Sequence, residues 1–430
     1  MKSIVRSVAL ALILASLAPF ALGAPDNTPA TRKVEQARKL IAAKPNDAQG
    51  YSELALGLAR RARETSDPAY YAEAQKAIDQ AVTLAPESPE HEKAQIWVLL
   101  GQHEFARALE RARALNKRIP DDVLVYGFIV DAAVETGQYE EAERAAQWML
   151  DLRPGNIPGL TRAAYLRELF GDVDGAVELM LSALQRISPQ ETEDRAWTLT
   201  QIAHLRLAAG KTGDAEEAAR QALLLFPGYH YALGQMAKIK LAQNLATEAV
   251  EFERQRYQAA PHAENLYALA QAMRRAGRNK EARAAFAEFE QKALAESTGA
   301  DNANHELTYY YTDVAKKPAQ ALAIASREIA RRRDVHTLEA YGWALHVNGR
   351  SAEARQHLEA ALAVGIRDAG MFYRAGTIAM KQKDRKSAAR YLQQSLALAP
   401  DAEFAPTARR MLAVAGAGNR QVAMIRSGLR

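Results

Sequence analysis

The chain has 430 residues, of which 48% are hydrophobic and 25% are charged, so most of it is expected to be folded. Its formal net charge of +5 is too small and too dispersed to favour nucleic acid as a partner. Because the sequence contains no cysteine, it excludes disulfide bonds, thiol catalysis and thiolate metal sites.

The first 23 residues have the pattern of an export signal. Lys2 and Arg6 precede an apolar run over residues 8–20, and small residues follow at Ala21 and Gly23. This order is typical of a secretory signal peptide, with cleavage expected before Ala24. The alternative is that this segment stays uncleaved as a membrane anchor. After it, no apolar run reaches the roughly 18 residues that a membrane span needs. The sequence therefore predicts a periplasmic protein without a membrane span.

Short turns recur along the rest of the chain. One helix is expected to end at Gly137, because glycine accepts a left-handed conformation, and a second helix begins within a few residues. Ala142 is small enough to let these two helices touch. Equivalent alanines form the series Ala74, Ala106, Ala142, Ala176, Ala215, Ala249, Ala282, Ala321, Ala354 and Ala388. Their spacing is near 34 residues, with two spacings of 39, which predicts ten helix-turn-helix units with two longer connections.

Apolar residues flank each turn at helical spacing. The helix before Gly137 places Tyr126, Ile129 and Ala133 on one face, and Pro154 ends the helix that follows it. Similar patterns surround Gly210, Gly277 and Gly349. This combination of large residue, turn glycine, close-packing alanine and terminal proline resembles the tetratricopeptide repeat (TPR) family over about residues 46–413. The sequence departs from the family pattern at two turns, where Lys316 and Lys383 replace the glycine.

The resemblance implies an all-α fold, an α-solenoid in which antiparallel helix pairs stack into a right-handed superhelix with a concave, partner-binding inner face. Physical reasoning supports stacking, because a single pair cannot bury its apolar stripe. We expect a signal peptide (1–23), an N-terminal segment with a first helix (24–45), an N-terminal array (46–290), a longer linker (291–304), C-terminal units (305–401), a capping helix (402–414) and a mobile basic tail (415–430).

In a TPR stack the first helix of each unit lines the concave side. Counting back from the turn glycines gives the candidate groove residues Tyr165, Glu168, Trp197, His204, Tyr231, Lys238, Tyr267, Gln271, Arg274, Arg275, Tyr310, Trp343, His346 and Tyr373. These residue types are enriched in interface hot spots. The alternative for Trp197 and Trp343 is a place in the core. Lys238, Arg274 and Arg275 are expected to pair with carboxylates of a bound peptide or helix.

The sequence contains no recognisable catalytic motif. His-Glu-x-x-His and Gly-x-Ser-x-Gly are absent, and the carboxylate pair Glu140-Glu141 lies in the first turn of a helix, where it complements the helix dipole. We therefore expect a non-enzymatic scaffold or assembly factor of the bacterial cell envelope, with a protein or peptide partner and without cofactor or metal. The alternative is a regulatory or substrate-presenting subunit of an envelope polysaccharide or cell-wall enzyme, with a groove that binds glycan.

Overall fold

A computed structural model describes residues 27–427, with side chains to residue 416. The predicted signal peptide lies outside this range. All regular secondary structure in the range is helical. None of the helices in it is both long and apolar enough to cross a membrane.

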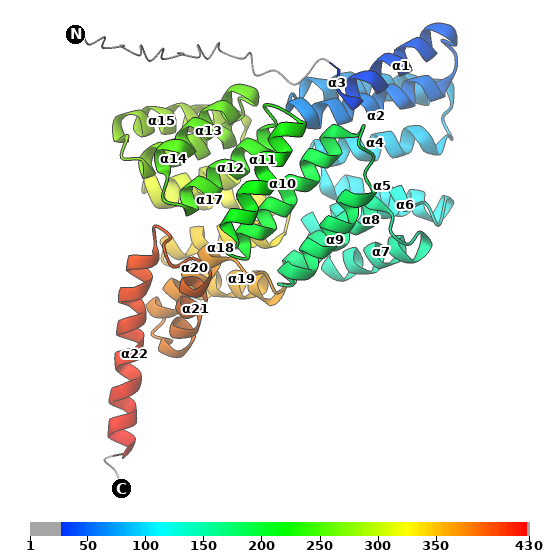
Figure 1. The fold of residues 1–430 in the computed structure, drawn as a ribbon. Coiled ribbons are helices and arrows are strands. Elements are labelled where there is room, and N and C mark those ends of the chain that lie inside the picture. The colour runs from blue at the N-terminus through cyan, green and yellow to red at the C-terminus, as the bar shows by residue number, and fades with distance from the viewer. Residues whose placement is uncertain (1–26, 428–430) are drawn as a thin grey trace, which may run out of the picture.

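Ten consecutive helix pairs follow α1 (Pro29–Ala43) within the described residues (Figure 1). The first helices of the pairs are α2 (Ala48–Thr65), α4 (Pro89–Gly101), α6 (Val123–Glu135), α8 (Ile157–Leu169), α10 (Thr192–Ala208), α12 (His230–Ala242), α14 (Ala263–Arg275), α16 (Asn304–Tyr309), α18 (Val335–Val347) and α20 (Ala369–Lys381). The second helices are α3 (Ala69–Leu84), α5 (Phe105–Arg118), α7 (Tyr139–Leu152), α9 (Val173–Arg186), α11 (Thr212–Leu225), α13 (Ala246–Ala259), α15 (Asn279–Glu296), α17 (Pro318–Glu328), α19 (Ser351–Ala363) and α21 (Arg385–Leu398). A π-helical turn, Tyr310–Val314, extends α16.

Nine of the ten alanines predicted to lie between paired helices are buried. The exception is Ala106, which is exposed, and Ala108 takes its place with no exposed surface. The reason lies in the preceding turn: His103 adopts the left-handed conformation (φ 60°), whereas Gly101 is the last residue of α4. With Ala108 in the series, the first three spacings are all 34 residues.

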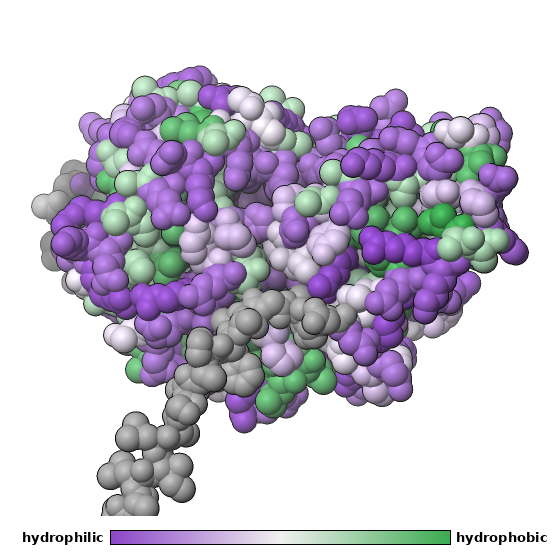
Figure 2. Space-filling view, turned by 90° about the horizontal axis from the view of Figure 1, so that it is seen from above, coloured by the Kyte–Doolittle hydropathy of each residue, from purple (hydrophilic) through white to green (hydrophobic). Residues whose placement is uncertain are grey.

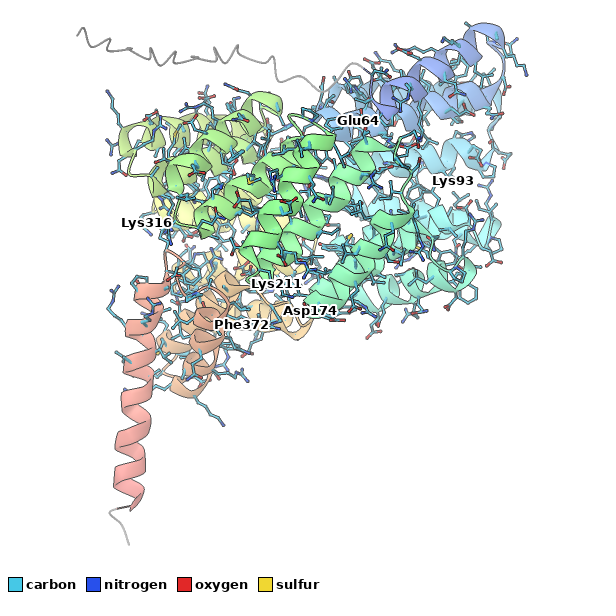
Figure 3. All side chains as sticks on the ribbon, viewed as in Figure 1. Glu64, Lys93, Asp174, Lys211, Lys316 and Phe372 are labelled. Carbon is cyan, nitrogen blue, oxygen red and sulfur yellow. The ribbon has the colours of Figure 1, made fainter. Side chains whose placement is uncertain are left out.

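Lysine takes the left-handed turn position in two pairs, as the sequence indicates. Lys316 has φ 55° and Lys383 has φ 63°, close to the 76° of Gly137. Figure 3 shows Lys316 at the edge of the molecule, where its long side chain has room. Non-glycine residues in this conformation carry a steric cost, so both turns are less stable than a glycine turn.

The longer connections differ from the expected boundaries. Helix α15 continues to Glu296, so the predicted linker 291–304 begins inside a helix and only residues 297–303 connect α15 to α16. At the C-terminus, α22 (Ala405–Ser427) starts three residues later than the predicted capping helix and continues well beyond residue 414. Most of the predicted basic tail therefore belongs to this helix, which extends away from the other helices (Figure 1).

Successive turns of the superhelix touch along a line of contacts that we call the seam. The seam joins Ser66 to His262, His103 to Asp301, Glu135 to Arg332 and Arg333, Tyr139 to Val335, and Gly171 to Gly365. Each contact links residues 194 to 198 positions apart, which is nearly six repeats. One superhelical turn therefore takes slightly fewer than six helix pairs.

The hydrophobic core is continuous across the seam. A single cluster of buried side chains includes Phe128 of α6 and Leu169 of α8 together with Val335 and Leu345 of α18 and Phe372 of α20. A second cluster runs from α12 to α18. Because the cores of the two superhelical turns merge, the solenoid is closed against itself rather than extended as an open spiral.

Candidate functional site

The first helices carry the candidate groove residues, and we call the side of α8 to α20 that bears them the inner face. Tyr165 and Tyr231 are exposed, at 38% and 39%, and Lys238 is also exposed. Burial nevertheless raises the pKa of Tyr231 to about 12 and lowers the pKa of Lys238. Tyr231 also lines a cavity between the two superhelical turns. The inner face is therefore partly enclosed.

Charges from several units act on Lys238. The carboxylates of Glu168 on α8, Glu253 on α13 and Glu264 on α14 raise its pKa, although burial and Arg256 outweigh them and lower it. On the same side, the Glu168 carboxylate lies 2.5 Å from His204 Nε2, so an ion pair or hydrogen bond joins α8 and α10. Lys238 and its neighbours thus form a polar region shared by consecutive units.

The two tryptophans of the candidate set have different surroundings. Trp197 is half-buried and packs against the core clusters of α8 to α12, which is the core alternative left open by the sequence. Trp343 donates a 2.8 Å hydrogen bond from Nε1 to Asp313 and stacks on His346 with a ring separation of 5.1 Å. Arg374 lies over the rings of Trp343 and Tyr309, at 5.6 and 4.3 Å from their centroids, and pairs with Glu339.

Tyr310 does not line the inner face, which corrects the prediction. It is 8% exposed and packs on Phe286 and Phe289 of α15, with ring separations of 5.5 and 5.7 Å. The π-helical turn that begins at Tyr310 changes the angular position of each residue, so counting back from the turn at Lys316 fails there. Tyr309, beneath Arg374, is the tyrosine on the inner side.

The candidate residues of α14 differ in their surroundings. Tyr267 contacts Phe286 edge-on and Phe289 at a tilt, and it accepts a 2.6 Å hydrogen bond from Gln271. Arg274 and Arg275 are half-buried at the end of the helix. The Arg274 guanidinium lies 3.2 Å from the Glu403 carboxylate, so one predicted partner-binding cation already has a partner within this chain.

The segment before α22 contacts the inner face, which sequence reasoning missed. Besides the Glu403–Arg274 pair, Phe404 stacks on Tyr373 with a ring separation of 4.7 Å and an interplanar angle of 12°. Two candidate residues, on α14 and α20, are therefore covered by residues 403 and 404. The only sequence signal was an acidic and an aromatic residue shortly after the helix-ending Pro400.

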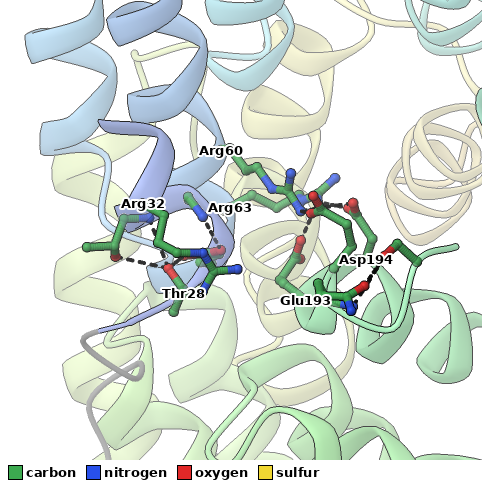
Figure 4. A network of polar contacts seen from close by, with 12 residues as sticks. Thr28, Arg32, Arg60, Arg63, Glu193 and Asp194 are labelled. Atoms are coloured by element: carbon green, nitrogen blue, oxygen red, sulfur yellow. Dashed lines mark hydrogen bonds and ion pairs between the residues drawn. The ribbon is translucent and has the colours of Figure 1, made fainter. Parts of the chain in front are cut away.

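A cluster of ion pairs that we call the charge clamp, also missed, joins α2 to α10 (Figure 4), and Arg60 and Glu193 are its buried members. Arg60 lies 2.5 Å from Glu191 and 2.9 Å from Asp194, and Arg63 pairs with Glu193. Tyr229 donates a 2.5 Å hydrogen bond to the fully buried Glu193. Burial raises the pKa of Tyr229 well above its ordinary value, so the hydroxyl remains protonated and able to donate.

A cavity of about 580 Å³ lies next to this clamp, between the two superhelical turns. Its walls come from α2 to α4 on one side and from α12, α14 and the connection 297–303 on the other, and they include Arg63, Tyr71, His103, Tyr231, Glu264 and Asp301. Both arginines and carboxylates line it. The described residues contain no group of three or more side chains that could hold a metal ion.

The rest of the surface carries mainly polar and charged side chains. Seen from above, it is mostly hydrophilic with small, separated hydrophobic patches (Figure 2). Neighbouring units are linked by ion pairs such as that between Lys211 and Asp174, at 3.2 Å, which lie side by side in Figure 3. Exposed pairs of this kind contribute little to stability.

Comparison with known proteins supports the repeat assignment. The tetratricopeptide repeat profile matches residues 369–402, which span α20 and α21. No curated protein sequence matches the chain. The solved structure of the human IFIT1 dimer with PPP-AAAA shares the fold, with 15% identity over 86% of each chain and a TM-score of 0.50. Yeast Tom70 has 15% identity over 85% of this chain and 96% of that chain, with a TM-score of 0.37. PilW, a type IV pilus biogenesis factor, has 14% identity over 49% of this chain and 93% of that chain, with a TM-score of 0.39.

The similarity to IFIT1 concerns the fold alone. The matched residues form the helix pair α20 and α21, with Ala388 fully buried at the close-packing position. The chain therefore contains a tetratricopeptide repeat, and its described part is an all-α solenoid of the TPR type.

Proposed function

We propose that this protein is a non-enzymatic scaffold or assembly factor that binds a polypeptide on the inner face of its solenoid. The observation that carries this proposal is a set of aromatic and charged side chains on the first helices that the core does not use. Tyr165, Tyr231 and Lys238 are exposed there, although neighbouring residues of α8 and α12 are buried. Exposed aromatic side chains on rigid helices can anchor a ligand at a low entropic cost.

Photo-crosslinking from defined positions tests this proposal. A photoreactive amino acid replaces Tyr165 or Tyr231 in the full chain, and Leu224, which is 74% exposed on α11, serves as the control position. We expect polypeptide adducts, identified by mass spectrometry, from the two inner positions and not from Leu224. Equal labelling from Leu224, or no adduct from either inner position, would contradict the proposal.

The alternative, a glycan-binding subunit of an envelope polysaccharide or cell-wall enzyme, has the exposed tyrosines in its favour because aromatic rings also stack on sugars. Binding of purified cell-wall fragments or exported polysaccharide to the purified protein would support this alternative. We expect no such binding, and a loss of glycan binding in Tyr165→Ala and Tyr231→Ala would replace the polypeptide proposal with the glycan one.

The proposed location is the periplasm of a bacterial envelope, and it rests on the signal pattern around Lys2, Arg6 and residues 8–20. Fractionation of cells that produce the full chain, followed by N-terminal sequencing, tests it. We expect the mature protein in the periplasmic fraction with Ala24 as its first residue. A protein that keeps Met1 and stays in the cytoplasm would contradict this location.

A further inference from the structure

Residues 403 and 404 contact the inner face in the manner of a bound peptide. Glu403 Oε2 lies 3.2 Å from Arg274 Nη2, and the ring of Phe404 lies parallel to the ring of Tyr373 at 4.7 Å. Arg274 is on α14 and Tyr373 is on α20, so the two contacts connect the ends of a surface formed by four consecutive first helices. Residues 403 and 404 thus bridge α14 and α20.

The contact to Arg274 is incomplete. Arg274 Nε is shielded from solvent but has no hydrogen-bond partner, and only one Nη atom reaches the carboxylate. A guanidinium can bind a carboxylate through two parallel N–H donors. The Glu403 side chain is 58% exposed, and exposed ion pairs are weak. A carboxylate that approached Arg274 side-on would satisfy the free Nε–H and would bind more strongly than Glu403 does.

The neighbouring residues hold the dipeptide close to the surface. Ala405 and Ala408, in the first turn of α22, are buried against the body of the protein. The internal dipeptide is therefore present at a high effective concentration, which compensates for its weak contacts. Since the anchor lies outside residues 403 and 404, these two side chains can leave Arg274 and Tyr373 while α22 stays attached.

We propose that Glu403 and Phe404 are an internal ligand of the inner face, and that a partner polypeptide with a carboxylate next to an aromatic side chain displaces them. This inference rests on the proposed function, because it names the chemistry of the polypeptide that the inner face accepts. The partner's carboxylate binds Arg274 through two N–H donors, and its aromatic ring takes the place of Phe404 on Tyr373.

A peptide copied from the chain itself is the probe. A fluorescent peptide with the sequence of residues 399–406 is titrated, with fluorescence anisotropy as the readout, against the full wild-type chain and against the double variant Glu403→Ala/Phe404→Ala. We expect the double variant to bind at least about tenfold more tightly, because the competing internal ligand is gone. A control peptide with alanine in place of its glutamate and phenylalanine should not bind.

Further substitutions locate the binding site. Arg274→Ala in the double variant should abolish peptide binding, whereas Arg283→Ala, at an exposed arginine on α15, should leave it unchanged. Equal affinity of the wild type and the double variant, or binding that survives Arg274→Ala, would overturn the inference. Circular dichroism verifies that each variant is folded. The crosslinking positions Tyr165 and Tyr231 lie on α8 and α12, so the proposed function can survive a failure of this test.

Discussion

The backbone N–H of Arg333 donates a 2.9 Å hydrogen bond to the carbonyl oxygen of Glu135, although nearly six repeats separate the two residues. A main-chain contact between two superhelical turns requires close approach, and the residue that permits it is the turn glycine Gly137. A Cβ atom added at Gly137 would lie 2.8 Å from the carbonyl oxygen of Arg333. The same glycine therefore ends α6 and admits the neighbouring superhelical turn.

Substitutions at two glycines distinguish the role in ending a helix from the role in admitting the neighbouring superhelical turn. Gly137 and Gly277 have φ angles of 76° and 73°, but a Cβ at Gly277 would meet nothing within 4 Å. We expect Gly277→Ala to cost about 1–2 kcal/mol, because alanine disfavours the left-handed conformation. Gly137→Ala should cost a further 1–3 kcal/mol or so, since the seam must also shift. Denaturant midpoints of both variants provide the measurement, and equal losses would show that the seam does not depend on Gly137.

The charge clamp that joins α2 to α10 provides a second prediction about stability. Arg63→Met would leave the Glu193 carboxylate, which has no exposed surface, without its cation. Breaking a buried ion pair from one side costs about 3–5 kcal/mol. Arg63→Met/Glu193→Gln should recover part of this loss, because glutamine can still accept the hydrogen bond from Tyr229. Thermal unfolding of the single and double variants tests the coupling, which is absent if the double variant is less stable than Arg63→Met.

The repeat could be predicted from the sequence because its signals are local. Gly137 and Ala142 act within one helix pair, so their spacing alone located nine of the ten buried alanines. The prediction was wrong at Ala106, because His103 and not a glycine makes the preceding turn, and Ala108 is the buried alanine of that pair. The count to Tyr310 failed for the related reason that a π-helical turn intervenes.

The seam and the internal dipeptide could not be predicted in this way. The distance between Glu135 and Arg333 depends on small rotations between many successive pairs, and no single pair contains that information. The position of Glu403 against Arg274 depends on the same accumulated curvature, together with the direction in which the chain leaves α21. The side chains on the inner helices were accessible to sequence reasoning, but the segment that covers two of them was not.

Glycine in place of a left-handed turn lysine should make the protein more stable. Lys383 has φ 63°, which costs a residue with a side chain about 1–2 kcal/mol relative to glycine. We expect Lys383→Gly to raise the free energy of unfolding by about 1 kcal/mol. The matched control is Lys76→Gly, at an exposed lysine in the middle of α3, which should lower it by about 1 kcal/mol. If the free energy of unfolding changes in the same direction in both variants, the left-handed conformation of Lys383 carries no steric cost.

Glu306 on α16 should make the protein less stable as the pH rises. Burial and the nearby Glu264 carboxylate raise its pKa to about 7, although Arg256 and Arg332 oppose this shift. Because the folded-state pKa exceeds the ordinary value of 4.5, the folded protein binds the proton more tightly than the unfolded chain does. This contribution to stability is complete below pH 4.5 and is lost as the pH rises through about 7.

Glu306→Gln keeps the uncharged form at every pH, so it should remove this component of the pH dependence. We expect the free energy of unfolding of the variant to exceed that of the wild type by about 1–3 kcal/mol at pH 8 and to match it near pH 4.5. Denaturant midpoints measured from pH 4.5 to 8 provide the test. Glu87→Gln, at an exposed carboxylate between α3 and α4, controls for the loss of one negative charge. If both variants follow the wild-type pH profile, Glu306 is charged in the folded protein and the inner face tolerates its charge beside Glu264.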